Sequence, residues 1–293
     1  MSRNIIKSIC WDITSRCNEY CDFCYRNPDN KDLSLSSNEN ILRKLIDFGV
    51  DKISFVGGEP LLYEELFELV KFGKSYTSNP PLFSITTNAT LLTNIIDGHM
   101  NIDEKIMRKV LDIFDWVTFS LDAPNQEIQS LMGRNARHFE RILMLLEYMN
   151  DVNIQNKIKI NTVVSAINAD YMIELYMLLC KYNVKRWKIF RFLPSRGSAF
   201  ENRAKYYIST ECFLEKVRQI CSINNNNKIK ISVNGYEDFD NSYITISSEG
   251  KLIVYENGCY TARVDLQREN SDEILKYIDI DGHIRNRSDF LKI

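Results

Sequence analysis

Three cysteines near the start of the chain could do chemistry, because thiolates are the usual ligands of iron–sulfur clusters. They lie in the stretch Cys17-Asn18-Glu19-Tyr20-Cys21-Asp22-Phe23-Cys24-Tyr25, at C-x3-C-x2-C spacing. A structural zinc site normally has four Cys or His ligands, and none of the chain's three histidines has ligand spacing to this loop. The pattern therefore favours a [4Fe–4S] cluster bound by Cys17, Cys21 and Cys24, whose fourth iron stays open to react.

Predicted strands and helices alternate regularly around this loop and beyond it. After a first apolar run, Ile5–Trp11, the predicted strands are Lys52–Val56, Phe83–Thr86, Trp116–Leu121, Ile158–Val164 and Trp187–Phe192. Amphipathic helices separate them with a period of roughly 30 residues, as parallel βαβ units require. We therefore expect an α/β fold, a partial (β/α)6 TIM-like barrel over residues 1–200.

The alternation stops beyond Ser195. Residues 201–293 contain a predicted helix, Glu211–Ile223, and two short strands, Tyr243–Ile246 and Lys251–Tyr255, whose spacing is typical of a β-hairpin. No Pro-rich or Ser-rich linker precedes them. We therefore expect a C-terminal extension that packs on the barrel and is not an independent domain.

Composition excludes several classes of partner. Of the 293 residues 44% are hydrophobic and 26% are charged, as in ordinary globular proteins, and the formal net charge is −2. No overall field attracts nucleic acid or an anionic membrane, and the start of the chain shows no signal peptide or transmembrane span. Eight cysteines in a chain of this length do not make a secreted disulfide scaffold. We expect a cytoplasmic protein without nucleic-acid or membrane partners.

Residues that fill a core poorly follow the predicted strands at their carboxyl ends. They are the cysteine loop, Gly57-Gly58-Glu59-Pro60, Thr87-Asn88, Ser120-Leu121-Asp122, Asn161-Thr162 and Arg191. Any one of them could be a turn or a helix cap. Because (β/α) barrels build their sites at this end of the strands, together they predict a site at the mouth of the barrel.

The cysteine loop and Gly57–Pro60 resemble the radical S-adenosylmethionine (radical SAM) superfamily, with Tyr25 at the aromatic position after the last cysteine. The resemblance implies a [4Fe–4S] cluster and SAM as cofactors. The cluster would cleave SAM to a 5′-deoxyadenosyl radical that abstracts a substrate hydrogen, with electrons from a flavodoxin- or ferredoxin-type donor. The SAM-binding residues that it implies are Gly57, Gly58 and Glu59 at the amino group, Ser120 and Arg134 at the carboxylate, and Asn88 near the sugar.

Two of the predicted strands carry cations at alternate positions. Lys159 and Asn161 share one face of a strand, and Arg186 and Lys188 share one face of the next. If both faces point into the barrel, which is normally filled with apolar side chains, the buried cations need an anionic partner. A triphosphate would supply it. The alternative is a pair of edge strands with solvent-facing Lys and Arg.

These strands also resemble the viperin-like family of nucleotide-modifying radical SAM enzymes, as do Leu131–Arg134 and Asn241–Tyr243. The resemblance implies that a ribonucleoside triphosphate (CTP, UTP or GTP) becomes its 3′-deoxy-3′,4′-didehydro analogue, through abstraction of the ribose 4′ hydrogen, in antiviral or antiphage defence. The nucleotide residues that it implies are Lys159, Arg186 and Lys188 at the phosphates, Asn161 at the sugar, and Tyr243 near the ribose as a catalytic residue or a packing one.

Two other functions stay open on the sequence. A radical SAM enzyme acting on a peptide or a cofactor precursor would carry further close-spaced cysteines, and Cys212, Cys221 and Cys259 form no C-x2-C pair. An iron–sulfur redox sensor would want four cysteine ligands on its cluster and would have no use for Gly57–Pro60. The nucleotide interpretation therefore leads.

Overall fold

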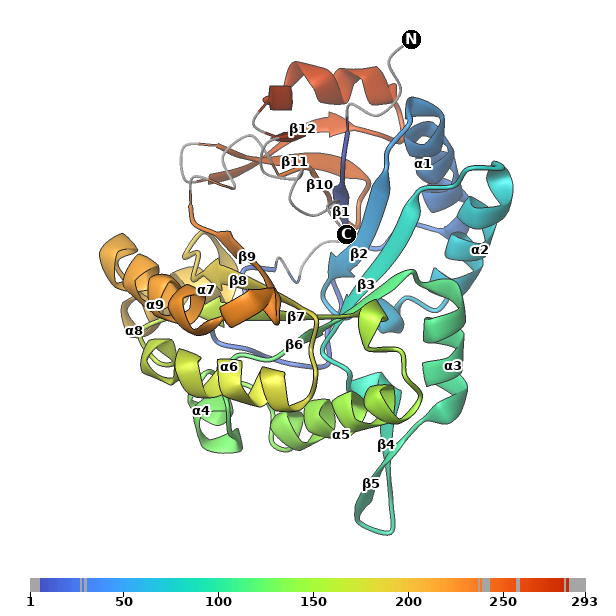
Figure 1. Ribbon diagram of the computed structural model, residues 1–293. Helices are drawn as coiled ribbons and strands as arrows, with labels where there is room; N and C mark the ends of the chain where they lie inside the picture. Colours follow the sequence, from blue (N-terminus) through green and yellow to red (C-terminus); the bar gives the residue numbers. More distant parts are fainter. Residues whose placement is uncertain are drawn as a thin grey trace.

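The computed structural model describes residues 6–26, 28, 31–236, 238, 243–256, 259–281 and 283–284. Within these residues the main feature is a ten-stranded sheet with the order β12-β11-β10-β1-β2-β3-β6-β7-β8-β9, which Figure 1 shows with helices along its outside. The strands that run parallel are β1 (Ile9–Thr14), β2 (Lys52–Gly57), β3 (Leu82–Thr87), β6 (Trp116–Ser120), β7 (Ile158–Val164), β8 (Arg186–Arg191) and β9 (Lys230–Asn234).

Helices connect successive strands and cover the outer face of the sheet. In α1, the Ser34 hydroxyl accepts a hydrogen bond from the Ser37 N–H, and Gly49, at φ +87°, ends the helix in the left-handed region that glycine tolerates. The connecting helices are α1 (Leu35–Phe48), α2 (Leu66–Tyr76), α3 (Glu104–Ile113), α4 (Gln126–Leu131), α5 (His138–Asp151), α6 (Met172–Lys181), α7 (Gly197–Glu201), α8 (Arg203–Tyr206) and α9 (Thr210–Ile223). The predicted α/β partial barrel is thus confirmed.

The prediction that the alternation of strands and helices ends at Ser195 is wrong, because one more helix and one more parallel strand follow. Helix α9 leads to β9, which pairs in parallel with β8. The strand Lys230-Ile231-Ser232-Val233-Asn234 alternates polar and apolar residues at the edge of the sheet, so it lacks the continuous apolar run of the buried strands. A hairpin also went unpredicted: β4 (Thr93–Ile96) and β5 (His99–Ile102) form a separate two-stranded sheet that projects from the barrel in Figure 1.

The C-terminal extension joins the same sheet. The short strand β10 (Thr245–Ile246) pairs in parallel with β1 and in antiparallel with β11 (Lys251–Glu256), as the predicted hairpin requires. Strand β12 (Cys259–Asp265) then pairs with β11. Tyr243, just before β10, contacts β8 across the barrel. Its Oη accepts a hydrogen bond from Lys188 Nζ of β8 at 2.7 Å. The sheet therefore curls until β10 and β8 approach each other.

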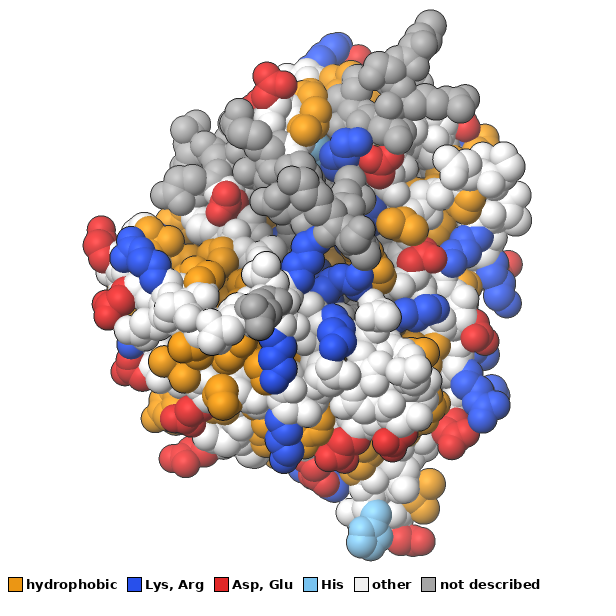
Figure 2. Space-filling model, in the orientation of Figure 1, with side chains coloured by type: hydrophobic (Ala, Val, Ile, Leu, Met, Phe, Trp, Pro, Cys, Tyr) orange, Lys and Arg blue, Asp and Glu red, His pale blue; other side chains and the backbone are white. Residues whose placement is uncertain are grey.

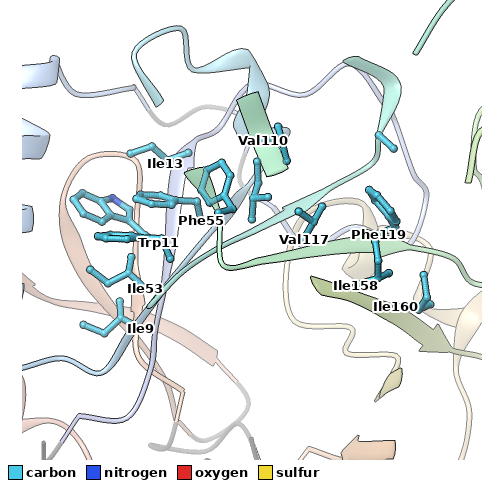
Figure 3. Close-up of a cluster of buried hydrophobic side chains, with 14 of the residues drawn as sticks. Ile9, Trp11, Ile13, Ile53, Phe55, Val110, Val117, Phe119, Ile158 and Ile160 are labelled. Atoms are coloured by element: carbon cyan, nitrogen blue, oxygen red, sulfur yellow. The ribbon is translucent and has the colours of Figure 1, made fainter. Parts of the chain in front are cut away.

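The main core lies between the sheet and its helices. Alternate residues of each strand point outward, and Figure 3 shows those of β1, β2, β6 and β7 gathered with Val110 of α3. The rings of Trp11, Phe55 and Phe83 stack with centroids 5.8 and 6.2 Å apart. Each such side chain contributes about 1.5–3 kcal/mol on burial, so this layer holds the helices against the strands. Among the described residues no helix has the length and apolar character that crossing a membrane requires.

Candidate active site

A cavity of about 280 Å³ occupies the carboxyl ends of the strands and the inside of the barrel. A typical (β/α) barrel is filled with branched apolar side chains, whereas here the inward positions carry serine, threonine, lysine and asparagine. The sequence-predicted site residues that line the cavity are Cys17, Cys21, Cys24, Tyr25, Gly57, Gly58, Asn88, Ser120, Arg134, Lys159, Asn161, Lys188 and Tyr243. Glu59 and Arg186 are not among the lining residues.

The three predicted cluster ligands all face this cavity. Cys21 is buried, and burial raises the pKa of its thiol to about 12; burial raises the pKa of Cys17 as well. These thiols would ionise on binding a positively charged metal centre. Within the described residues no three His, Cys, Asp or Glu side chains could hold one metal ion. Three thiols spread along one loop therefore fit a cluster with several irons better than a single zinc.

Two glycines press the second strand against the cysteine loop. Gly58 N–H donates to Thr14 O at 2.8 Å, and Glu59 N–H donates to Arg16 O at 2.8 Å. A Cβ added to Gly58 would lie 1.9 Å from Arg16 O, and one on Gly57, at φ +121°, would lie 2.4 Å from Thr14 O. Only glycine permits this approach, so these residues set the position of the residue before Cys17.

Gly58→Ala is expected to displace the cysteine loop, because its Cβ would overlap the Arg16 carbonyl. Overpacking of this kind costs about 1–3 kcal/mol. We expect a lower Tm and less iron retained after reconstitution. Gly98→Ala is the contrast, since nothing lies within 4 Å of its added Cβ and only the φ of +78° opposes it. Equal Tm and iron content in the Gly58 variant and the parent protein would contradict the packing argument.

The Glu59 side chain lies behind the cavity wall and holds the segment Thr87–Asn88 in place. Its carboxylate accepts hydrogen bonds from Thr87 Oγ1 and the Asn88 N–H, each at 2.8 Å, and from the Leu61 N–H at 3.2 Å. Asn88 in turn donates to Asn18 Oδ1 at 2.9 Å, inside the cysteine loop. Burial raises the pKa of Glu59 to about 7, although these hydrogen bonds oppose the rise. Glu59 thus links the second and third strands to the cluster loop.

SAM affinity is expected to rise with pH between about 6 and 8. Below its pKa of about 7 the Glu59 carboxyl is protonated, so it loses part of its capacity to accept from Asn88 and to hold that segment against the cysteine loop. Above that pKa the carboxylate accepts fully. Binding of SAM to the reconstituted protein, measured by calorimetry across this range, tests the expectation. Glu59→Gln should bind weakly and without this pH dependence; a parallel profile in that variant would assign the titration to another group.

Arg134 lies at the cluster end of the cavity among acidic side chains. Its guanidinium is 2.8 Å from Asp122 Oδ2, 3.3 Å from Glu19 Oε2 and 3.5 Å from Cys21 Sγ. Glu19 Oε1 is buried with no hydrogen-bond partner among the described residues. Since a buried acceptor without a donor is costly, this end of the cavity fits a ligand that carries both a carboxylate and an amino group, as SAM does.

Three of the four predicted nucleotide residues on β7 and β8 meet inside the barrel. Lys159 and Asn161 of β7 and Lys188 of β8 all line the cavity, and Lys188 is only 2% exposed. The Asn161 side-chain oxygen is buried without a hydrogen-bond partner in the described part of the chain. This arrangement excludes the alternative of solvent-facing edge strands for these two strands. It presents cations for an anion and an acceptor for a hydroxyl.

Arg186 lies apart from these groups. It begins β8, and its guanidinium donates to Asn156 O and lies 4.8 Å from the centre of the Trp116 ring. The alternation of the strand does turn it inward, like Lys188, but one layer closer to the amino ends of the strands. The geometry therefore gives Arg186 a backbone carbonyl and an aromatic ring as partners, and the cavity wall does not include it.

Several lining residues escaped the sequence analysis. Lys52, the first residue of β2, is 5% exposed, lines the cavity and lies 4.5 Å from the centre of the Trp116 ring. The sequence pattern that could have identified it is the period-two alternation of Lys52, Ser54 and Val56, which places all three on the inward face of the strand. Phe23 also lines the cavity and packs on Tyr206, with Arg134 5.0 Å above its ring. Phe23 directly precedes the last cysteine of the loop, Cys24, and Tyr25 directly follows that cysteine.

Charge also marks the molecular surface near this region. Figure 2 shows Lys and Arg side chains gathered near the middle of the face turned to the viewer, although the formal net charge of the chain is −2. The positive charge on this face is therefore local, since the chain as a whole has a formal net charge of −2.

A family model described as the radical SAM superfamily matches residues 11–179, more than half of the chain. An S-adenosylmethionine-dependent nucleotide dehydratase of Flammeovirga pacifica is 28% identical over 267 residues, which cover 88% of this chain and 85% of the relative. One of the same name from Selenomonas ruminantium is 27% identical over 249 residues, covering 82% and 83%.

Solved structures share the fold at low identity. Streptococcus suis SuiB bound to S-adenosylmethionine superposes with a TM-score of 0.69 at 17% identity, over 97% of this chain and 68% of that one. The anSMEcpe structure with bound AdoMet gives 0.69 at 17%, over 96% and 79%. Because the family model spans the cysteine loop, the Gly57–Pro60 turn pressed against it and strands β2 to β7, this chain belongs to the radical SAM superfamily, whose enzymes use a [4Fe–4S] cluster and SAM.

Proposed function

We propose that this chain is a viperin-like, SAM-dependent nucleotide dehydratase. It converts a ribonucleoside triphosphate, CTP, UTP or GTP, to the 3′-deoxy-3′,4′-didehydro analogue. The observation that carries the proposal is a set of three lysines that line one cavity inside the barrel: Lys52 and Lys188, which are buried, and Lys159, which is half-buried. Three ammonium groups around one cavity attract a polyanion, and the names of the two bacterial relatives supply its class.

The residues divide between the two ligands. Cys17, Cys21 and Cys24 hold the cluster, while Gly57, Gly58, Ser120 and Arg134 face SAM beside Cys21 and Asn88 lies by the cysteine loop. When bound, these cofactors supply a 5′-deoxyadenosyl radical that takes the ribose 4′ hydrogen. On this proposal Lys159 and Lys188 bind the phosphates, and the unpartnered oxygen of Asn161 accepts from a ribose hydroxyl.

Tyr243 connects the extension to the phosphate-binding face. Its hydroxyl accepts from Lys188 Nζ at 2.7 Å, and its ring centre is 5.1 Å from the same nitrogen. These contacts orient Lys188 in any case, and they put the phenol on the cavity wall. On the proposal the phenol faces the ribose, where it can pass a proton or a hydrogen atom. Asn241 and Ser242, which resembled the same family segment, lie outside the described residues.

The proposal includes the setting of the reaction. A flavodoxin- or ferredoxin-type protein supplies the electrons, the enzyme works in the reducing cytoplasm, and the chain-terminating product serves antiviral or antiphage defence. The eight cysteines, all of them free thiols, suit such a compartment.

A cofactor precursor is the second candidate substrate. A GTP 3′,8-cyclase of Staphylococcus carnosus is 30% identical over 192 residues, but these cover only 61% of this chain and 52% of that protein. That enzyme too is named for a nucleotide. The cationic barrel interior fits either reaction, so the products decide between them.

One assay tests the proposal. Reduced, reconstituted protein is incubated with SAM and each of the four ribonucleoside triphosphates, and with cytidine as the control that lacks phosphates. We expect at least one of CTP, UTP and GTP to raise 5′-deoxyadenosine above the uncoupled background and to yield a product lighter by one water. A cyclised GTP of unchanged mass would favour the second candidate. No stimulation by any nucleotide would refute the nucleotide proposal altogether.

A further inference from the structure

One wall of the cavity carries a carboxyl that the roles above leave unused. Asp12, on β1, lines the cavity and lies 4.0 Å from a guanidinium nitrogen of Arg196. Arg196 also donates to Tyr25 O at 2.8 Å and lies 4.5 Å from the centre of the Tyr260 ring. The rings of Tyr25 and Tyr260 stack 5.8 Å apart. A strand, the cluster loop, the segment after β8 and β12 thus meet around one carboxyl.

Asp12 is the cavity-lining carboxyl with the most freedom to exchange a proton. The other two, Glu19 and Asp122, are fixed by Arg134 at 3.3 and 2.8 Å, and Asp122 also accepts from the Val163 N–H at 2.8 Å. Within the described residues no hydrogen bond holds the Asp12 carboxyl, which lines the cavity and whose side chain is 24% exposed. A carboxyl in this state can approach a ligand.

The position of Asp12 lies between the cluster end and the phosphate-binding face. Tyr25 directly follows the last cluster cysteine, and Arg196 joins its backbone to the Asp12 carboxyl, at 2.8 Å and 4.0 Å. Tyr243 in turn holds Lys188. A nucleotide with its phosphates on Lys188 and its ribose toward the cluster would therefore place its sugar beside the wall that carries Asp12.

We propose that Asp12 is the acid that protonates the departing 3′-hydroxyl group of the nucleotide. The inference rests on the proposed dehydratase function, because only a dehydration needs this proton. Hydroxide is a poor leaving group, and a positioned general acid typically accelerates such a step by roughly 10²–10⁴-fold. Asp12 would touch the reacting oxygen and is on this view a catalytic residue.

The step balances with the reactants already named. Removal of the 4′ hydrogen leaves one unpaired electron on C4′. The C3′–O bond then breaks, its electron pair stays with the oxygen, and the Asp12 proton completes a water molecule. The sugar is left as a radical cation across C3′ and C4′, and one electron from the donor protein converts it to the 3′,4′-didehydro product. Asp12, now a carboxylate beside Arg196, regains its proton from solvent.

The surroundings of Asp12 favour its acid form more than an exposed site would. Burial raises its pKa to about 6, and Arg196 opposes the rise. The other titratable groups in this wall are phenols and a thiol: Tyr25, Tyr243 and Tyr260, with Cys10 on the same face of β1. None of these carries charge near neutral pH, and a bound triphosphate would raise the pKa of Asp12 further.

Asp12→Asn tests the proposal, because it keeps the shape and removes the proton. The variant is expected to bind SAM and nucleotide, and to move deuterium from a 4′-deuterated substrate into 5′-deoxyadenosine. Its didehydro product per 5′-deoxyadenosine should fall at least tenfold. Asp12→Glu should recover part of this ratio. Asp112→Asn, the same change on an exposed residue of α3, should leave it unaltered.

Two further measurements hold even if Asp12→Asn loses its cluster. In the parent enzyme the product ratio should fall as the pH rises through the Asp12 pKa, since the acid form is lost. In cluster-free protein, infrared difference spectra of the parent against Asp12→Asn should show a carboxyl that titrates near pH 6.

Several results would overturn the inference. They are an unchanged ratio in Asp12→Asn, loss of nucleotide-dependent 5′-deoxyadenosine from a variant that still binds both ligands, a pH-independent ratio in the parent, or a normal aspartate titration. Failure of the proposed function itself looks different, because the parent enzyme would then form no didehydro product from any nucleotide.

Discussion

Cys17→Ala abolishes SAM cleavage: no 5′-deoxyadenosine forms above the level without enzyme, whatever nucleotide is present. On our proposal the three thiols of the loop are the cluster ligands, and within the described residues no group of three His, Cys, Asp or Glu side chains offers another site for a metal ion. Two remaining thiolates cannot hold the cluster in register with SAM. Iron and sulfide content, the visible absorption of the cluster and 5′-deoxyadenosine yield measure the loss.

Cys221→Ala is the matched control for this variant. Cys221 is an exposed thiol of α9, outside the cavity, so the same chemical change should leave iron content and SAM cleavage as in the parent. A Cys17 variant that retained parental iron and cleaved SAM would refute the assignment of the ligands. Equal loss in both variants would show that the cysteines act through stability and not through iron binding.

Much of this site could be predicted from the sequence because its determinants are local. The cysteine spacing fits within one loop, and Gly57–Pro60 combines a close backbone approach with a carboxylate in four successive residues. Period-two alternation on two strands put Lys159 and Lys188 on inward faces, and the structure brings them to one cavity. Such patterns need only the geometry of a strand or a turn.

The alternation of a strand does not give depth along the barrel. Arg186 and Lys188 share a face, yet Arg186 contacts Asn156 O near the amino ends of the strands, outside the cavity wall. Lys52 begins its strand, and Ser54 rather than a second cation lies two residues later, so a search for cations at alternate positions does not find it. Which layer a side chain enters depends on the stagger between neighbouring strands, and one sequence does not reveal that stagger.

Contacts between distant segments were beyond the sequence as well. Arg196, which follows β8, meets Asp12 of β1 because the sheet curls, and Tyr260 meets Tyr25 because the extension folds back over the cluster loop. Strand β9 was missed for a related reason: as an edge strand it has water on one side and needs no apolar run. The positions most informative about the reaction are thus the ones that tertiary folding creates.

Lys188→Ala weakens nucleotide binding far more than it affects SAM cleavage without nucleotide. The ammonium is buried and lies in the cavity wall, where water does not screen it. A hydrogen bond to a charged group contributes about 1.5–3 kcal/mol, which corresponds to a loss of roughly 10- to 100-fold in affinity. Calorimetric binding of CTP, UTP and GTP to the SAM-loaded protein measures the effect, and the salt dependence of binding should fall with the lost charge.

Two further variants separate charge from packing. Lys188→Met keeps most of the side-chain volume, so it should preserve the fold and yet lose affinity as the alanine variant does. Lys105→Ala removes a lysine from the exposed face of α3 and should bind nucleotide like the parent. Affinity that is unchanged in both Lys188 variants would take away the cationic interior as the support for a triphosphate substrate. Affinity lost in the alanine variant alone would instead assign Lys188 to packing against Tyr243 and Phe190.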